Sequence, residues 1–299
     1  MSGQLRNLKS RIRGIQNTHK ITRAVEMVAT AKLSRFQSKL LQARPFTIGL
    51  NRLVERLHRA QPSPGMGKTA YAGHPFFETR EKRRTALLVI TSDTGLCGSY
   101  NLDLVSRVRS FFQNHAADRL PVLLAVGKFG MAALERQGFK LDYVFPDLRA
   151  ARVESVLKEF TEILTRLYTQ QTIDAAYAVY GHVLSLTAYE QKLEKLLPLD
   201  LSEIPTEMSS FSVSDYILEP SAESLFTSLI PLYFESKMRM LFLESLVSEQ
   251  IARMQAMHQA TENAREMTEM LTLRMNNARQ ASITKEIIEV VSGSRAMKN

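Results

Sequence analysis

The sequence lacks most of the residues that disulfide, metal or membrane-spanning proteins need. Its 299 residues include one cysteine, Cys97, which excludes an internal disulfide and is typical of a reducing compartment. No apolar run is long enough to cross a bilayer, and the basic N-terminus has no apolar secretory core. The six histidines are scattered, without the spacing of metal ligands. The composition therefore predicts a soluble chain with a real core and no metal or cofactor.

A phosphate-binding loop is also lacking. Residues 62–69 read PSPGMGKT, which ends like such a loop, but Pro62 stands where the pattern requires its first glycine. No buried strand precedes the stretch, and Gly73 and Pro75 would break a helix after it. We interpret residues 60–84 as a linker rich in proline, glycine and basic residues.

Acidic residues are nearly missing from the first 54 residues. That segment has eleven Lys or Arg and only Glu26 as an acid, so its charge is 11 − 1 = +10, against +9 for the whole chain. A basic end of this kind indicates an acidic partner, which could be nucleic acid, anionic lipid or an acidic protein surface. From the residues alone, nucleic acid is the first hypothesis.

Few helix breakers occur near the N-terminus, between residues 3 and 58. Apolar residues there follow the spacing of three and four that a helical seam has. The predicted seam comprises Leu5, Leu8, Ile12 and Ile15, and continues through Val25, Val28, Lys32, Phe36 and Leu40. We expect one long helix, bent near Pro45.

Glycine and proline are absent from residues 232–292, which predicts a second long helix of about 90 Å at 1.5 Å per residue. Its seam is thin, with alanine and methionine at many positions: Leu243, Val247, Met254, Met257, Ala264, Leu271, Met275 and Ala278. A single small domain cannot cover so long a helix. We therefore expect it to pair with the first helix.

Between the two helices, apolar runs alternate with helical stretches, as in a small doubly wound sheet. The predicted strands are 85–92, 120–127, 139–145 and 175–183, and the predicted helices are 102–117, 128–137 and 152–170. The fold class is therefore α/β plus a long antiparallel coiled coil, with a Rossmann-like domain inserted between the two helices. The predicted boundaries are 1–59 for the first helix, 60–84 for the linker, 85–219 for the α/β domain and 220–299 for the second helix.

A glycine-bearing turn, SDTGLCGSYN (92–101), follows the first predicted strand, where α/β domains often bind ligands. Its spacing is not that of a dinucleotide-binding loop, so a structural turn is the better interpretation. Asn101 is better placed than Ser92 or Asp93 to cap the following helix. Cys97 has no histidine partner in the sequence pattern, which favours a buried packing role over that of a nucleophile.

Three separated stretches, in order, carry a resemblance that covers nearly the whole chain. They are LKSRIRGIQNTHKITRAVEMVATAKL (8–33), SDTGLCGSYN (92–101) and ARQASITKEIIEVVSG (278–293). They resemble the first helix, the central signature and the C-terminal signature of the γ subunit, or central stalk, of rotary F-type ATP synthases.

The chain departs from the family pattern at Thr94, where Arg is usual, at Ser99, where Gly is usual, and at Ser294, where Ala is usual. The 60–84 linker is also longer than in a compact bacterial member. These departures leave open a divergent paralogue with a different coupling ion.

The resemblance implies a rotor shaft that couples ion flow to conformational change and performs no catalysis itself. Its implied partners are the catalytic and non-catalytic nucleotide-binding subunits of the ATPase ring, a small stalk subunit and the ion-carrying rotor ring of the membrane. By the same resemblance, Arg279, Gln280 and Thr284 would contact a loop of the catalytic subunits. Four basic residues would face an acidic segment of those subunits: Lys20, Arg23, Lys32 and Arg35. The resemblance thus favours an acidic protein surface over nucleic acid.

The implied location is the cytoplasmic face of a bacterial membrane, because no transit peptide is apparent. Two alternatives belong to other classes. A coiled coil that binds nucleic acid would explain the basic end but not the inserted domain. An enzyme that uses a nucleotide would need a binding loop in the α/β domain.

Overall fold

The computed structural model describes residues 2–59, 74–81, 84–114, 119–145, 153–200, 219 and 221–296. The stretch 62–69 and most of the predicted linker 60–84 lie outside the described residues. The chain divides into two compact units. We call Met1–Thr30 with Arg253–Asn299 the paired-helix unit, and Ala31–Ala252 the sheet unit.

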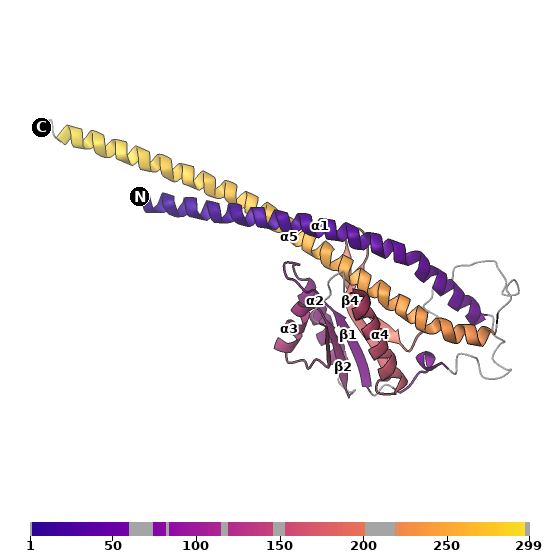
Figure 1. The fold of residues 1–299 in the computed structure, drawn as a ribbon. Helices are drawn as coiled ribbons and strands as arrows, with labels where there is room; N and C mark the ends of the chain where they lie inside the picture. The colour runs from indigo at the N-terminus through magenta and orange to yellow at the C-terminus, as the bar shows by residue number, and fades with distance from the viewer. Residues whose placement is uncertain are drawn as a thin grey trace. The chain divides into compact units, whose positions relative to one another are not determined.

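Helix α1 (Ser2–Arg59) is a single helix that passes through Pro45 (Figure 1). Its predicted seam is correct at Ile12, Phe36 and Leu40, which are buried. The prediction is wrong at Val28, which is 54% exposed, and at Lys32, which is exposed, because neither belongs to the observed seam. The observed seam passes instead through Ala29 and Leu33, each one position later in the sequence. This phase keeps the Lys32 ammonium in water, whereas the predicted phase would bury an unpaired charge.

Helix α5 (Ala222–Ala296) is longer than the run 232–292 and contains Pro231. Proline within a helix costs about 3 kcal/mol, since it removes a hydrogen bond and crowds the preceding turn. Phe226, Ile230 and Phe234 lie around it and are fully buried, so the packing of this face offsets that cost. The predicted α5 seam is buried at Leu243, Val247, Met257, Ala264 and Leu271.

The two helices pair antiparallel within each unit. In the paired-helix unit, Thr22 Oγ1 lies 2.9 Å from Thr261 Oγ1, and Glu26 Oε1 lies 2.9 Å from His258 Nδ1. Residue numbers therefore increase along α1 in the direction in which they decrease along α5. In the sheet unit, Thr47 Oγ1 and Ser236 Oγ are 2.8 Å apart.

The sheet has five strands in the order β3-β2-β1-β4-β5. Strands β1 (Arg84–Ile90), β2 (Arg119–Val126), β3 (Tyr143–Phe145) and β4 (Ala175–Val183) are parallel, and correspond to the four predicted runs. The third is shorter than predicted. Strand β5 (Tyr189–Leu197) pairs antiparallel with β4 at the sheet edge and was not predicted. The segment that forms this sheet is inserted in the sequence between the two long helices, which pair with each other. The predicted fold class is therefore confirmed.

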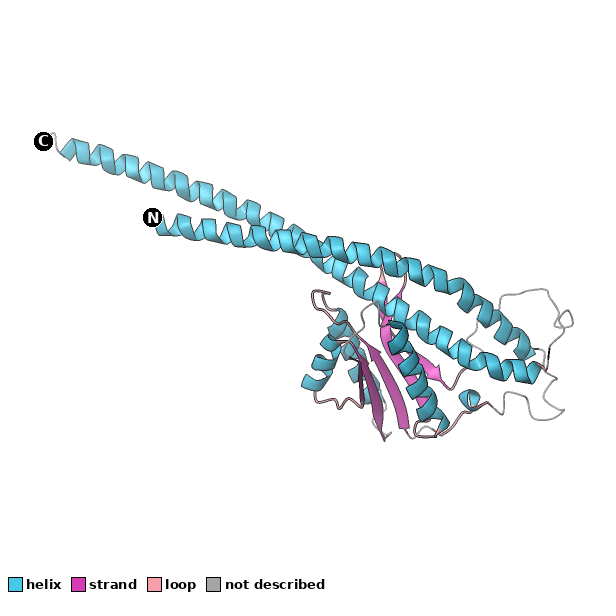
Figure 2. Cartoon of the chain, in the orientation of Figure 1, coloured by secondary structure: helices cyan, strands magenta, loops and turns pink. Residues whose placement is uncertain are grey.

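Helices cover both faces of the sheet (Figure 2). Helices α2 (Tyr100–Asn114) and α3 (Lys128–Arg136) pack on the face of β1 that presents Leu87 and Val89. Helix α4 (Val153–Thr169) covers the other face and joins α5 through Phe160 and Phe242, whose ring centroids are 5.7 Å apart. A short 3₁₀ helix, η2 (Pro75–Phe77), precedes β1.

The turn 92–101 is a packed structural turn. Cys97 is buried in the core, as expected. The expectation that Asn101 caps the next helix is wrong, because α2 already begins at Tyr100. The Asn101 side chain instead accepts a hydrogen bond from the Ser92 N–H at 3.1 Å and closes the turn. Asp93 accepts from the first N–H of α3, at Lys128.

Candidate partner interface

Two of the predicted contact residues, Lys20 and Arg23, lie on α1 in the paired-helix unit. Both are exposed, and neither forms an ion pair with any described residue. Lys20 lines a groove of about 460 Å³ together with Gln16, His19, Arg265, Thr268 and Glu269. The Arg265 guanidinium is already bound by Glu262 and Glu269 of its own helix, at 3.1 and 2.9 Å. Lys20 therefore keeps its charge available to a partner.

Lys32 and Arg35 belong to the sheet unit. Both are exposed and without ion pairs among the described residues. Close by in the sequence, Gln37 Nε2 donates to the Leu186 carbonyl in the β4–β5 turn, at 3.4 Å. This part of α1 therefore lies beside the tip of that hairpin.

Arg279, Gln280 and Thr284 are exposed near the end of α5. The Thr284 hydroxyl donates to the Gln280 carbonyl of its own helix, at 3.0 Å. In the antiparallel register set by Thr22 and Thr261, the part of α5 opposite Lys20 is near residue 263. The Arg279 group is 16 residues further, or about 24 Å along the helix at 1.5 Å per residue. The two groups of predicted residues are therefore separate.

The end of α5 reverses its polarity after Ser282, the last buried residue of the seam. The line that continues the seam carries Glu286 and Glu289. Exposed apolar side chains occupy the opposite side: Ile283, Ile287, Ile288, Val290 and Val291. At about 100° per residue they fall within an arc of about 160°.

Gln280 and Thr284 project within the same arc, and Arg279 lies at its border. This predicted contact group thus shares one face with the five exposed apolar residues. Acidic residues on the seam side cannot extend an apolar coiled coil, and the apolar side chains at this end of α5 are exposed on its outer face.

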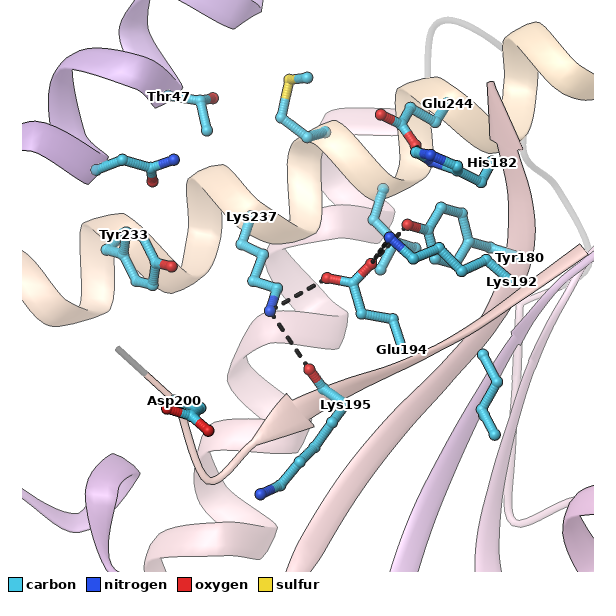
Figure 3. A pocket seen from close by; sticks show the side chains of 14 residues that line it. Thr47, Tyr180, His182, Lys192, Glu194, Lys195, Asp200, Tyr233, Lys237 and Glu244 are labelled. Carbon is cyan, nitrogen blue, oxygen red and sulfur yellow. Dashed lines mark hydrogen bonds and ion pairs between the residues drawn. The ribbon is translucent and has the colours of Figure 1, made fainter. Parts of the chain in front are cut away.

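A second polar cluster, which the sequence analysis missed, lies in the sheet unit (Figure 3). A cavity of about 540 Å³ is lined by residues of α1, α5, β4 and β5. At its centre the Glu194 carboxylate accepts from Tyr180 at 2.7 Å and pairs with Lys237 at 3.1 Å and Lys192 at 3.3 Å. Beside it, His182 Nδ1 lies 2.6 Å from Glu244 Oε2.

Electrostatics in this cluster keep Glu194 ionised. Burial by itself would raise the pKa of the carboxyl group. The charge of Lys237, the Tyr180 hydroxyl and the charge of Lys192 outweigh burial, and the pKa of Glu194 falls below its ordinary value. Burial, with Glu194 beside it, raises the pKa of Tyr180, which therefore remains a neutral donor. No sequence signal marks these residues, since their contacts depend on the packing of β5 against α5.

None of the helices, over the residues that the structure describes, combines the length and apolar character needed to cross a bilayer.

Comparison with known proteins gives one consistent result. Residues 4–297 match the family described as ATP synthase. The ATP synthase gamma chain of Desulforamulus reducens is 36% identical, with 98% of this chain and 99% of that one covered. The gamma chain of Heliobacterium modesticaldum is 37% identical at the same coverage of both chains.

Solved structures agree with this assignment. The central stalk and c-ring structure of the Tetrahymena thermophila mitochondrial ATP synthase matches at 27% identity and a TM-score of 0.56, covering 80% of this chain and 99% of that one. The rotor of the Euglena gracilis enzyme matches at 15% identity and a TM-score of 0.65, covering 95% and 100%, which shows a shared fold. The family indicated by the three signature stretches is confirmed: the chain belongs to the γ family of ATP synthase, a non-catalytic subunit of that complex.

Proposed function

We propose that the chain is the central rotor shaft of an F-type ATP synthase, which couples ion flow through the membrane sector to conformational change at catalytic sites on other subunits. Membership of the γ family supports this role. The observation that carries it is the end of α5, where apolar side chains, Gln280 and Thr284 share one outward face. A shaft end enclosed by a ring of subunits needs an outward apolar face of this kind.

The proposed partners are those that membership of the γ family implies, and the charge and exposure of the two helices support them. The catalytic and non-catalytic nucleotide-binding subunits surround the end of α5, and a loop of the catalytic subunits meets Arg279, Gln280 and Thr284. The exposed charges of Lys20, Arg23, Lys32 and Arg35 bind an acidic segment of the same subunits. A small stalk subunit and the ion-carrying rotor ring complete the rotor. The similar Tetrahymena structure, which is one of a central stalk and a c-ring, supports the last of these.

The mechanism is conformational coupling. An asymmetric shaft presents a different face to each of three catalytic sites and so holds each in a different state. A change of affinity from millimolar to nanomolar requires about 8 kcal/mol. One exposed salt bridge contributes about 0–1 kcal/mol, so the work must be spread over many contacts along two long helices. The same role places the chain at the cytoplasmic face of a bacterial membrane, attached through the complex.

Co-purification tests the role directly. A tagged chain drawn from native membranes should bring down two ATPase subunits in threefold stoichiometry, together with a small stalk subunit. Recovery of the chain alone, or with nucleic acid that dissociates steeply with salt, would reject the proposal in favour of the coiled coil that binds nucleic acid. Tight binding of ATP by the isolated chain would favour the enzyme.

A pair of arginine variants tests the contact at the end of α5. Arg279→Ala should lower the ATPase activity of the assembled complex by about tenfold, as expected for the loss of a charged hydrogen bond of about 1.4 kcal/mol. Arg274→Ala is the matched control, because Arg274 is also exposed on α5 but lies on the other side of the helix. Equal activities of the two variants would remove Arg279 from the interface.

A further inference from the structure

The cluster around Glu194 joins three elements of the sheet unit through one carboxylate. Tyr180 comes from β4, Lys192 from β5 itself and Lys237 from α5. Lys237 Nζ also donates to the carbonyl oxygen of Lys195 at 3.3 Å. Figure 3 shows these bonds converging on Glu194 and on the adjacent backbone of β5. Both Glu194 and Lys237 are about one-fifth exposed, so water screens their pairing only in part.

We propose that Glu194 is a positioning residue that fastens the edge strand β5 to the long helix α5 by charge. The clamp makes the edge of the sheet and its β4–β5 turn move with α5. That this edge turns together with the rotor shaft rests on the proposed function.

The position of β5 explains why such a clamp is needed. As an edge strand, β5 has ladder hydrogen bonds to β4 on one side only. Strands β1 and β2 are instead held by apolar side chains packed on both faces. The cavity of about 540 Å³ separates α1 and α5 from the face of β5 that carries Lys192 and Glu194. Among the described residues, two polar contacts join β5 to α5, one to the Glu194 carboxylate and one to the Lys195 carbonyl. Lys237 makes both of them.

The groups that face Glu194 determine how the clamp responds to its surroundings. Its neighbours across the cavity are His182 on β4, Lys192 and Lys195 on β5, Lys237 and Glu244 on α5, and Asp200 after β5; α1 contributes the neutral Thr47 and Asn51. The positive charge of the three lysines equals the negative charge of the three carboxylates, Glu194 included, and Glu244 pairs with His182. Protonation of Glu194, which requires a pH below its ordinary pKa of 4.5, should therefore release the clamp. High salt should release it too, because it screens the ion pairs.

Hydrogen exchange on the full chain, measured by mass spectrometry, tests this directly. Glu194→Gln should raise the exchange rate of the β5 amides about tenfold, while the amides of β1 and β2 keep their rates. Glu190→Gln is the matched control, since Glu190 is an exposed acid on the same strand and forms no ion pair among the described residues. It should change the β5 rates less than about twofold. Unchanged rates in Glu194→Gln, or faster exchange throughout the sheet, would overturn the proposal.

A second set of variants separates a charge clamp from simple packing. Lys237→Met should reproduce the effect of Glu194→Gln, and Lys237→Arg should restore slow exchange. Lys195→Met should have no effect, because the Lys195 ammonium bonds to none of the described residues. Potassium chloride at about 1 M should accelerate β5 exchange in the original chain but not in Glu194→Gln. Salt sensitivity that survives in Glu194→Gln would contradict the clamp. These measurements do not need the assembled complex, so their outcome is distinct from that of the co-purification.

Discussion

The paired-helix unit and the sheet unit share two helices, yet those helices bury different residues in each. In the sheet unit, α5 buries Phe226, Phe234 and Phe242 completely, the first two against η2 and the third against α4. In the paired-helix unit, the buried positions of α5 are smaller than phenylalanine or polar: Arg253, Met257, Thr261, Ala264, Leu271 and Ser282. Large rings fix α5 to η2 and α4 in the sheet unit, whereas the thin seam of the paired-helix unit leaves most of the surface of both helices exposed.

The largest expected effect comes from removing one of the rings. Phe242→Ala should lower the free energy of unfolding by about 3–5 kcal/mol, because a fully buried ring that packs on Phe160 leaves a cavity. Leu271→Ala, in the thin seam, should lower it by only about 2 kcal/mol, since two helices can close partly around the gap. Urea denaturation followed by circular dichroism measures both.

Leu273→Ala is the control for these two variants, because Leu273 is 62% exposed on α5. Its effect should stay within about 0.5 kcal/mol. A larger loss for Leu271→Ala than for Phe242→Ala would show that the two units do not differ as their packing indicates.

Glycine substitutions should have opposite signs in the two units. In the sheet unit, a methyl group on Gly181 would meet Ser248 Cβ at 2.6 Å and the Tyr100 hydroxyl at 2.9 Å. Gly181→Ala should therefore destabilise the chain by about 1–3 kcal/mol through overpacking. In the paired-helix unit, Gly14 has no described neighbour within 4 Å, and Gly14→Ala should stabilise α1 by about 0.5–1 kcal/mol. Thermal denaturation of both variants checks the signs, and two shifts in the same direction would contradict the difference.

Much of the fold could be predicted because its signals are local. The runs 85–92, 120–127 and 175–183 are apolar and branched, as buried parallel strands are, and each corresponds to an observed strand. Strand β5 gave no such signal. Its sequence, YEQKLEKLL, is rich in Lys and Glu because its outer face meets charges and water rather than a core.

What the sequence did not predict depends on contacts between distant segments. The seam phase near Ala29 follows from the partner helix, and a reading of α1 alone placed Val28 and Lys32 there instead. Glu194 and Lys237 are 43 positions apart, and only the packing of β5 against α5 brings them together. The contact residues themselves came from the family resemblance, since seven exposed side chains have no local pattern.

A smaller effect is expected at the hydroxyl pair that crosses the seam of the paired-helix unit. Thr22 and Thr261 are buried and bonded to each other, and each also has a carbonyl acceptor in its own helix, at His19 and Met257. Because those acceptors remain, a double-mutant cycle with Thr22→Val and Thr261→Val should give a coupling of about 0.5–1 kcal/mol. Thr30→Val is the control, since the Thr30 hydroxyl is exposed and bonds to the Glu26 carbonyl of its own helix. Zero coupling would mean that the apolar seam alone joins the helices there.

The smallest effect is expected at His74, which precedes η2 in the sheet unit. Its Nδ1 accepts the Phe76 N–H at 3.2 Å, and burial lowers the pKa of the ring below 6.5. The unfolded chain therefore takes up a proton first as the pH falls through 6.5, and the contribution of His74 to stability is lost on the acid side. His74→Asn keeps an acceptor for Phe76 but does not titrate. The melting temperature of the original chain, relative to that variant, should drop by about 1 °C between about pH 7.5 and 5.5. A difference that is constant over this range would show that the pKa of His74 is the same in the folded and unfolded chains, and would contradict the prediction.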